Sequence, residues 1–279
     1  MNIDFSFWLL VLTIASGIIA AIDKFKFEPK RLAPVMNKIK SMKKQERRKY
    51  IQKNKDLKAP FFADYASSLF SVFFIVFILR GFLIGNFLIP SASMTPTLPV
   101  GNFILVNKTS YGIRSPLTNN VWITTGKPKR GDISVFHFPV NPSVDFIKRI
   151  IGVPGDVISY QDKKLTINGS AVAYTNSLDN KINIYTGSSG GPNMICTEHL
   201  GKIAHKIDNM TNEPSVNFTN LVVPKDMYFV MGDNRDNSED SRYWGFVQDK
   251  YLVGKAFFVW FSWNNLNRSI RWDQIGRIL

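Results

Sequence analysis

The sequence predicts a mostly β protein that begins with two transmembrane helices and continues into an outer all-β domain with an inserted second β-rich subdomain. Two observations lead to this fold class. Two apolar runs of helical length precede residue 85, and a strongly basic segment separates them. After Pro90, short apolar runs alternate with turn signals, which is the pattern typical of strands.

The first apolar run covers residues 5–22, eighteen uncharged and mostly apolar residues. A helix of about 20 such residues crosses the hydrocarbon core of a membrane. A cleaved signal peptide starts with a basic region, whereas this run follows Asp4 and leads straight into the basic segment. We therefore expect residues 1–22 to form a retained transmembrane helix.

The second apolar run covers residues 65–84 and is also long enough to cross a membrane. Arg80 lies near one end of this run, where its guanidinium can extend to the interface at little cost. We expect this simple placement of Arg80 rather than a catalytic role.

The net charge of +14 arises mainly between the two predicted helices. Residues 23–60 hold fourteen Lys and Arg against four Asp and Glu, so this segment carries +10 and the rest of the chain +4. Short loops rich in Lys and Arg stay in the cytoplasm, which places residues 23–64 inside and the chain after residue 84 outside. The segment lacks the interleaved aromatic residues of a nucleic-acid-binding module, so no nucleic acid partner is expected.

The outer part of the chain divides into three segments. Residues 85–160 and 224–279 contain strand-like runs and are predicted to form one β domain. Residues 161–223 are polar and rich in Asn and Gly, as expected for an inserted subdomain that carries loops. Cys196 is the only cysteine, so no intramolecular disulfide is expected.

Residues 90–98 contain two serines, Ser91 and Ser93, in a window that carries no formal charge from residue 81 to residue 107. A serine becomes a nucleophile only beside a base, which can be a histidine, a carboxylate or a lysine. The base must therefore come from another segment of the chain.

Lys148 is one candidate base. Strand alternation places Phe146, Lys148 and Ile150 on one face, and burial in such an apolar face lowers the pKa of a lysine into the range of a general base. The alternative is that Lys148 reaches solvent at a sheet edge, and spacing alone favours this alternative.

Other chemistries have less support in the sequence. Residues 187–191 match G-x-S-x-G, but Pro192 and the loop composition do not fit the strand-to-helix turn that this motif requires. A calcium loop starting at Asp236 would need Gly and Glu at positions that hold Ser241 and Val247. The histidines lie in a strand pattern or in the polar insertion, which gives a Ser-His-Asp triad little support: His137, His199 and His205.

A third polar segment, residues 232–245, reads Gly-Asp-Asn-Arg-Asp-Asn-Ser-Glu-Asp-Ser-Arg-Tyr-Trp-Gly. Together with residues 90–98 and 145–156, it resembles bacterial type I signal peptidase, with the three motifs in the order of that family. Two N-terminal spans around a basic loop also resemble the Gram-negative form of this family. The resemblance covers essentially the whole chain, and the insertion matches in position only.

The resemblance implies that Ser93 is the nucleophile, that Lys148 is its general base, and that the Ser91 hydroxyl and the Ser93 backbone N–H form an oxyanion hole. Ala92 stands where many members have Gly, a small change. The resemblance also implies that Ser238 orients the lysine amine, and that no metal or organic cofactor is needed. Two further residues resemble the supporting ion pair of the family: Asp240 and Arg242.

The resemblance also implies the substrate-binding positions. Apolar residues in and just before the first motif, and one in the second motif, resemble the lining of shallow pockets that admit small side chains: Phe87, Ile89, Met94, Leu98 and Ile147. Asp145 and Phe146 would lie beside the extended substrate, whose backbone would add to a strand edge.

The function implied is a membrane-bound serine endopeptidase that removes N-terminal signal peptides from exported preproteins after a small-x-small motif. The enzyme would be a multi-pass protein of the bacterial inner membrane, with its catalytic domain in the periplasm near the export machinery. Ser93 follows the second run by about nine residues, which limits its distance from the membrane to roughly 30 Å.

Two other functions stay open at this point. One is a membrane-tethered β domain that binds exported chains without cleaving them, and the other is a self-cleaving Ser-Lys regulator. The peptidase hypothesis predicts that Ser93 Oγ and Lys148 Nζ lie within hydrogen-bond distance.

Overall fold

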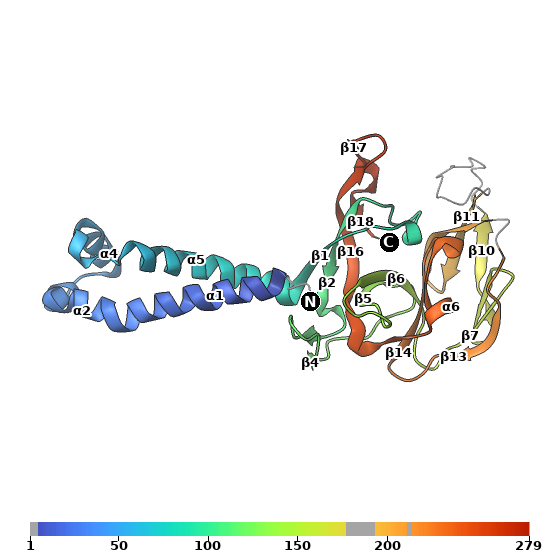
Figure 1. Cartoon of the computed structure of the whole chain (residues 1–279), viewed down its shortest axis with the longest axis horizontal. Coiled ribbons are helices and arrows are strands. Elements are labelled where there is room, and N and C mark those ends of the chain that lie inside the picture. Colours follow the sequence, from blue (N-terminus) through green and yellow to red (C-terminus); the bar gives the residue numbers. More distant parts are fainter. Residues whose placement is uncertain (1–4, 177–192, 211–213, 279) are drawn as a thin grey trace. The chain divides into compact units, whose positions relative to one another are not determined.

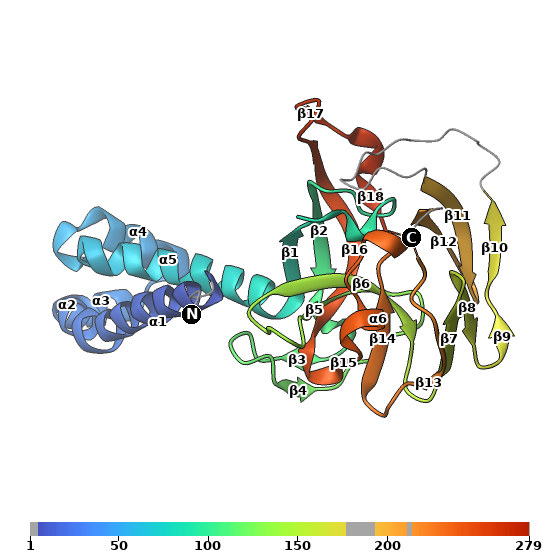
Figure 2. The same cartoon turned by 45° about the vertical axis from the view of Figure 1, so that its right-hand side comes forward.

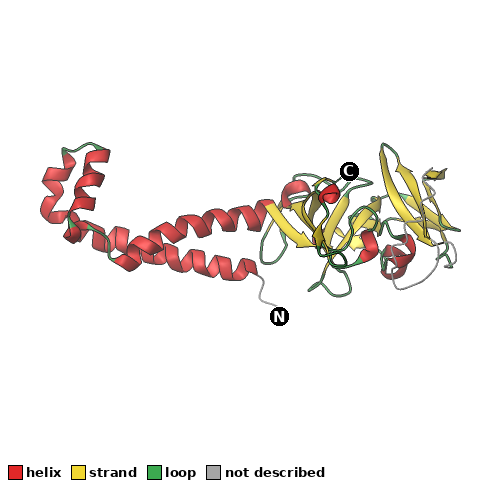
Figure 3. Ribbon diagram, turned by 90° about the horizontal axis from the view of Figure 1, so that it is seen from above, coloured by secondary structure: helices red, strands yellow, loops and turns green. Residues whose placement is uncertain are grey.

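The computed structural model describes residues 5–176, 193–210 and 214–278. The chain forms two compact units, Met1–Gly81 and Phe82–Leu279. In the described residues the first unit is helical and the second consists mainly of strands, as Figure 3 shows. This confirms the predicted fold class of two apolar N-terminal helices followed by a mostly β part. The G-x-S-x-G match at residues 187–191 lies outside the described residues.

The helical unit is a hairpin of two long apolar helices, α1 (Phe5–Ile22) and α5 (Phe61–Ile78), which pack against each other (Figure 1). Gly17 allows this close packing, because a Cβ at this position would lie 2.9 Å from the ring of Phe70. Two helical stretches of the described chain, Phe7–Lys40 and Phe61–Leu83, are long and apolar enough to cross a membrane.

The second apolar helix begins earlier than the apolar run suggested, at Phe61, and reaches Leu83 through one π-helical turn (Leu79–Leu83). Pro60 precedes the first turn, where a missing N–H costs no hydrogen bond. The Asp64 carboxylate lies in that turn, where the helix dipole favours negative charge. These signals explain why the helix includes a charged residue ahead of the apolar run.

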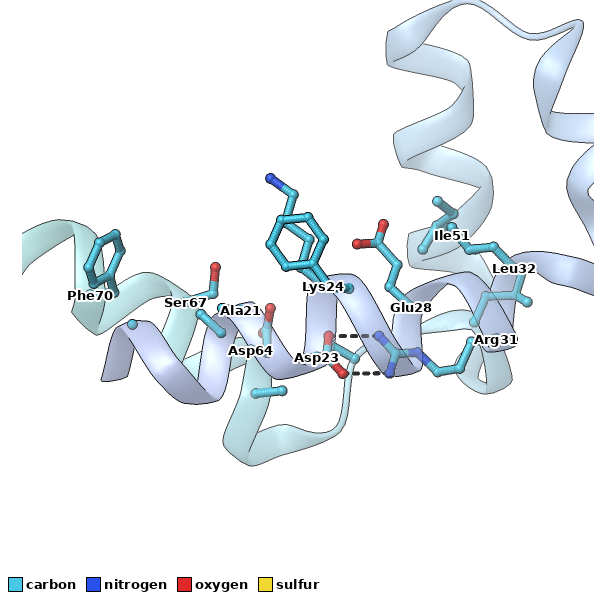
Figure 4. Close-up of a pocket in the computed structure, with 16 residues that line it drawn as sticks. Ala21, Asp23, Lys24, Glu28, Arg31, Leu32, Ile51, Asp64, Ser67 and Phe70 are labelled. Carbon is cyan, nitrogen blue, oxygen red and sulfur yellow. Dashed lines mark hydrogen bonds and ion pairs between the residues drawn. The ribbon is translucent and has the colours of Figure 1, made fainter. Parts of the chain in front are cut away.

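The basic segment folds into short helices that close the hairpin: α2 (Glu28–Leu32), α3 (Met36–Lys40) and α4 (Lys44–Lys53). A cavity of about 560 Å³ lies in this unit, lined mainly by residues of α1, α2 and α5. Figure 4 shows that its lining includes Asp64 and the Asp23–Arg31 ion pair, whose atoms are 2.6 Å apart. The residues that line this cavity include none of the predicted site residues.

The second unit is built on a nine-stranded antiparallel sheet with the order β1-β2-β16-β5-β6-β14-β15, and β17 and β18 also pair with β16. β6 therefore lies between β5 and β14, in the middle of the sheet. The strands are β1 (Ile84–Leu88), β2 (Asn102–Asn107), β5 (Ile133–His137), β6 (Asp145–Gly152), β14 (Met227–Met231), β15 (Val247–Gln248), β16 (Leu252–Asn264), β17 (Ser269–Ile270) and β18 (Gly276–Arg277).

Three smaller sheets complete this unit, and Figure 2 shows two of them beside each other. One has the order β13-β7-β8-β9, the second β10-β11-β12, and the third pairs β3 with β4. Their bounds are β3 (Ile113–Arg114), β4 (Val121–Ile123), β7 (Val157–Gln161), β8 (Lys164–Ile167), β9 (Ser170–Ala171), β10 (Ala173–Asn176), β11 (Asn193–Leu200), β12 (Ile203–Met210) and β13 (Phe218–Val222). A short helix, α6 (Ser241–Trp244), follows β14.

The serine-containing segment is held by the apolar core of the large sheet. Met94 and Leu98 are fully buried in a cluster with Ile104 and Val135, and the Leu98 N–H donates to the Met94 carbonyl at 2.8 Å. Burying one such side chain contributes about 1.5–3 kcal/mol. The core therefore fixes the backbone on both sides of residue 95, next to Ser93.

Candidate active site

Three segments that are far apart in the sequence meet at Ser93. Ser93 lies in a 3₁₀ turn (Ala92–Met94), and Lys148 lies in the central strand β6. The Lys148 Nζ donates to Ser93 Oγ at 2.6 Å, as the sequence analysis expected of these two atoms. The third segment follows β14, whose Met231 pairs with Arg149 next to Lys148.

Residues of the third segment hold the serine turn by its backbone. The Asn234 N–H donates to the Ser93 carbonyl at 3.1 Å, and its side-chain amide donates to the Ala92 carbonyl at 3.2 Å. The Thr97 hydroxyl donates to Asp233 Oδ2 at 2.5 Å. Side chains from both segments thus fix the direction in which Ser93 points.

Lys148 is buried, with 4% of its surface exposed, and its Nζ lies 5.5 Å from the centre of the Phe146 ring. The alternative of a solvent-exposed edge lysine is wrong, because β5 and β14 cover both edges of β6 near this residue. Burial lowers the pKa of Lys148 to about 8, although the nearby carboxylate of Asp240 acts in the opposite direction. A substantial fraction of Lys148 is therefore neutral near pH 8.

Two further serines of the three segments, Ser91 and Ser238, form hydrogen bonds through their hydroxyl groups. The hydroxyl oxygens of Ser91 and Ser93 are 3.4 Å apart. The Ser238 hydroxyl donates to Asp240 Oδ2 at 2.9 Å, which leaves the lone pairs of its oxygen available as acceptors. The roles of Ser91 in an oxyanion hole and of Ser238 in orienting the lysine stay predictions.

The ion pair between Asp240 and Arg242 holds together the loop that follows β14. Asp240 is fully buried, and its Oδ1 and Oδ2 accept from Arg242 Nε and Nη2, each at 2.8 Å. Its Oδ2 also accepts from the Gly232 N–H at 2.9 Å. Asp240 thereby ties the start of the loop to its end, and as the N-cap of α6 it also fixes the first turn of that helix.

Sequence reasoning did not single out the buried pair of Arg149 and Asp233. Arg149 Nε and Nη2 donate to the two Asp233 oxygens at 2.8 and 2.7 Å, and both side chains are fully buried. Strand alternation places Arg149 on the face opposite Lys148, where solvent is the ordinary expectation. The sequence did carry one signal for this pair, which is that Lys148 and Arg149 are adjacent cations in one strand. If both are buried, Arg149 needs a carboxylate from another part of the chain as its partner.

Of the predicted substrate-binding residues, Phe87 and Ile147 are partly buried and retain accessible surface. Asp145 is exposed, and its Oδ1 accepts a hydrogen bond from His137 Nδ1–H at 2.7 Å. Phe146 stacks on Phe138 with ring centres 4.2 Å apart. The remaining three are at most 2% exposed and pack in the same core cluster: Ile89, Met94 and Leu98.

This chain is similar to proteins of one known family. Residues 62–263 match the family described as signal peptidase, peptidase S26, a range that contains all three motifs. The chain belongs to this signal peptidase family. It is therefore a serine peptidase and a hydrolase, and the alternative of a non-enzymatic β domain is wrong.

Several relatives are similar over nearly their whole length. Signal peptidase I of Pseudomonas fluorescens is 41% identical over 275 residues, covering 94% of each chain. Signal peptidase I of Haemophilus influenzae is 32% identical, covering 92% of this chain and 86% of its own. A crystal structure of a signal peptidase I from Enterococcus faecalis is 32% identical, with a TM-score of 0.29, and covers 46% of this chain and 96% of its own.

Gly232 is a second residue of this signal peptidase family member that the sequence analysis did not assign a function. A Cβ at this position would overlap the Ser238 side chain and the Ser93 carbonyl oxygen. The backbone of Gly232 thus lies directly against the Ser93 carbonyl and the Ser238 side chain, and only glycine fits there.

Substituting Gly232→Ala is expected to lower kcat by at least about tenfold and to destabilise the fold by about 1–3 kcal/mol, because the methyl group must displace Ser93 or Ser238. Steady-state kinetics and thermal unfolding of the full chain in micelles measure both effects.

Gly155→Ala is the matched control. Gly155 is an exposed turn residue with φ of +89°, where a Cβ would meet no atom within 4 Å. It should cost about 1–2 kcal/mol of stability through the left-handed backbone and leave kcat unchanged. A Gly232→Ala variant with wild-type kcat would contradict this assignment.

Proposed function

We propose that this member of the signal peptidase family cleaves N-terminal signal peptides from exported preproteins by a Ser-Lys dyad, with Ser93 as nucleophile and Lys148 as general base. The observation that carries the proposal is the 2.6 Å hydrogen bond between Lys148 Nζ and Ser93 Oγ in a buried setting. A buried amine with a lowered pKa can accept a proton near neutral pH, which an exposed lysine cannot.

In the first half of the reaction, neutral Lys148 takes the proton of the Ser93 hydroxyl as Oγ attacks the scissile carbonyl carbon. The resulting ammonium then protonates the departing amine, which is the new N-terminus of the mature protein. An ester between Ser93 and the signal peptide remains. In the second half, Lys148 takes a proton from water as the water oxygen attacks the ester carbonyl. The ammonium then returns this proton to Ser93 Oγ, and the signal peptide leaves with a free C-terminal carboxyl group.

Charge develops on the carbonyl oxygen during both halves. We propose that the Ser91 hydroxyl and the Ser93 backbone N–H donate to this oxyanion. The position of Ser91 Oγ, 3.4 Å from Ser93 Oγ, supports this role, because a donor must lie beside the attacked carbon.

Substrate specificity is proposed to come from shallow apolar pockets that accept the small-x-small motif. The accessible parts of Phe87 and Ile147, backed by the buried core, support shallow rather than deep pockets. β14 pairs with Arg149, Ile150 and Gly152 of β6, so on this edge of β6 residues 145–147 extend past the region that is paired with β14. An extended signal peptide can add to this edge through backbone hydrogen bonds.

The proposed location is the bacterial inner membrane, with the two apolar helices crossing the bilayer. The basic segment between them would stay in the cytoplasm and the β unit in the periplasm, following the distribution of Lys and Arg. The partners would be signal peptides, the surrounding lipid bilayer and, by proximity, the protein-export machinery.

Ser93→Ala and Lys148→Met test the dyad. Each is expected to reduce kcat/KM by at least about four orders of magnitude, since nucleophile and base act as one unit. The assay follows cleavage of a purified preprotein with a small-x-small site by the full chain in micelles. Lys164→Met, at an exposed position of β8, should keep wild-type activity. Near-wild-type cleavage by either dyad variant would exclude the mechanism.

Ser91→Ala tests the oxyanion hole. Losing one donor of this kind lowers kcat by roughly two to three orders of magnitude, and KM should change little because the interaction forms mainly in the transition state. Steady-state kinetics separate the two parameters. Unchanged kcat would remove Ser91 from the mechanism.

The rate should depend on pH through Lys148, whose pKa is lowered to about 8. Only the neutral amine acts as base, so kcat/KM is expected to rise with pH up to this value and then level off. At pH 6, about 1% of the lysine is neutral, which predicts a rate about 100-fold below the plateau. Initial rates at low substrate between pH 6 and pH 10 measure this, and a midpoint near the ordinary lysine value would contradict it.

A further inference from the structure

The predicted insertion supplies two buried polar side chains that reach the active-site loop. Glu198 of β11 and His205 of β12 are opposite each other in the strand register, and they are 0% and 6% exposed. Glu198 Oε1 and Oε2 accept from Arg235 Nη1 and Nη2 at 2.7 and 2.5 Å. Arg235 belongs to the loop that follows β14, so this pair joins the insertion to the active site.

Arg235 braces that loop at two points. Its Nε donates to the Gly232 carbonyl at 3.2 Å, and its own carbonyl accepts from Arg242 Nη2. Because Arg235 is fully buried, water cannot replace Glu198 as its partner. The position of the Gly232 backbone, which lies against the Ser93 carbonyl, thus depends on a carboxylate from β11.

The insertion also reaches the other side of the same loop. His205 Nε2 lies 3.3 Å from Glu198 Oε2 and 3.7 Å from Asp233 Oδ1. The Asp208 N–H donates to the Asp233 carbonyl at 2.8 Å. The sheet of β10, β11 and β12 therefore contacts the loop at residues 233 and 235.

The buried charges in this region compensate one another. Burial alone would raise the pKa of Glu198, but Arg235 and His205 hold it well below its ordinary value. Burial likewise acts to raise the pKa of Asp233, and Arg149 and His205 lower it. Both carboxylates are therefore charged at neutral pH, and removing the charge of Glu198 would leave Arg235 buried without a counter-charge.

We propose that Glu198 is a positioning residue for the peptidase: through Arg235 it holds residues 232–240 closed over Lys148 and Ser93. The inserted sheet then has a part in catalysis, which is to keep water away from the lysine. This inference rests on the proposed function for its kinetic consequences, and on contacts between described residues for its structural ones.

In this proposal Glu198 affects the pKa of Lys148 by positioning the loop that follows β14, and not by a direct electrostatic interaction with the lysine. The charged groups that act most strongly on the Lys148 ammonium are Asp240, Arg242, Glu239 and Asp233. All four lie in residues 233–242, the segment that Arg235 braces. If this segment moves outward, water reaches Lys148 and its pKa rises toward the ordinary value of 10.5.

Glu198→Gln tests the proposal in the full chain in micelles, because it keeps the side-chain shape and removes the charge. The pH dependence of Lys148 acetylation by acetic anhydride, read by mass spectrometry, gives its titration midpoint without any substrate. The midpoint is expected to rise by about one unit or more, and kcat for a preprotein at pH 7 to fall about tenfold or more, with KM within about twofold.

Lys206→Gln is the matched control, because Lys206 is exposed and adjacent to His205 on the same strand. It should keep the wild-type midpoint and kcat. Glu198→Asp retains the charge with a shorter reach and should give a smaller shift in the same direction. It carries the same test if the glutamine variant does not fold.

A lowered unfolding temperature with a wild-type Lys148 midpoint and a wild-type kcat would overturn the proposal, because Glu198 would then act on stability alone. If the wild-type chain failed to cleave preproteins while Glu198→Gln still shifted the midpoint, the positioning role would stand and the proposed function would fail. The two failures are therefore distinguishable.

Discussion

The buried ion pair of Arg149 and Asp233 is the interaction on which the active site depends. It joins the strand that carries Lys148 to the loop after β14, and Thr97 attaches the serine segment to the same carboxylate. A buried pair of this kind adds little net stability, because desolvation offsets most of its attraction, but breaking it costs about 3–5 kcal/mol. Its effect is to specify one arrangement of three segments, the one that brings Lys148 to Ser93.

Two adjacent cations in β6 show how environment decides their chemistry. Arg149 is fully buried, and its guanidinium donates to the Asp233 carboxylate and to the Gly131 carbonyl, so it acts as a structural link. Lys148 faces a serine hydroxyl and an aromatic ring, and its burial favours the neutral form. Both side chains are buried, and their different roles follow from their nearest hydrogen-bond partners. Arg149 has a carboxylate as its partner, whereas Lys148 has a serine hydroxyl.

Much of the fold follows from local sequence patterns, whereas the site follows from contacts that local patterns do not encode. The apolar runs predicted both long helices. Alternation left the burial of Lys148 open, and spacing alone favoured a solvent-exposed lysine, whereas Lys148 is buried. Its pairing with Ser93, fifty-five residues away, came from resemblance to a family. Arg149 was not predicted because a charge on the second face of a strand normally meets solvent, whereas here a carboxylate from the loop after β14 covers it. Glu198 lay in a polar segment whose composition suggested loops, and its burial depends on how two sheets pack.

The covalent intermediate tests the central claim most directly. When the full chain is mixed with a preprotein and quenched in acid within one turnover, mass spectrometry of the peptide that contains Ser93 should show the signal peptide bound through an ester to its Oγ. The adduct should be absent in Ser93→Ala and in Lys148→Met. Release of mature protein by the wild-type chain without any adduct on Ser93, or with an adduct on another residue, would contradict the account.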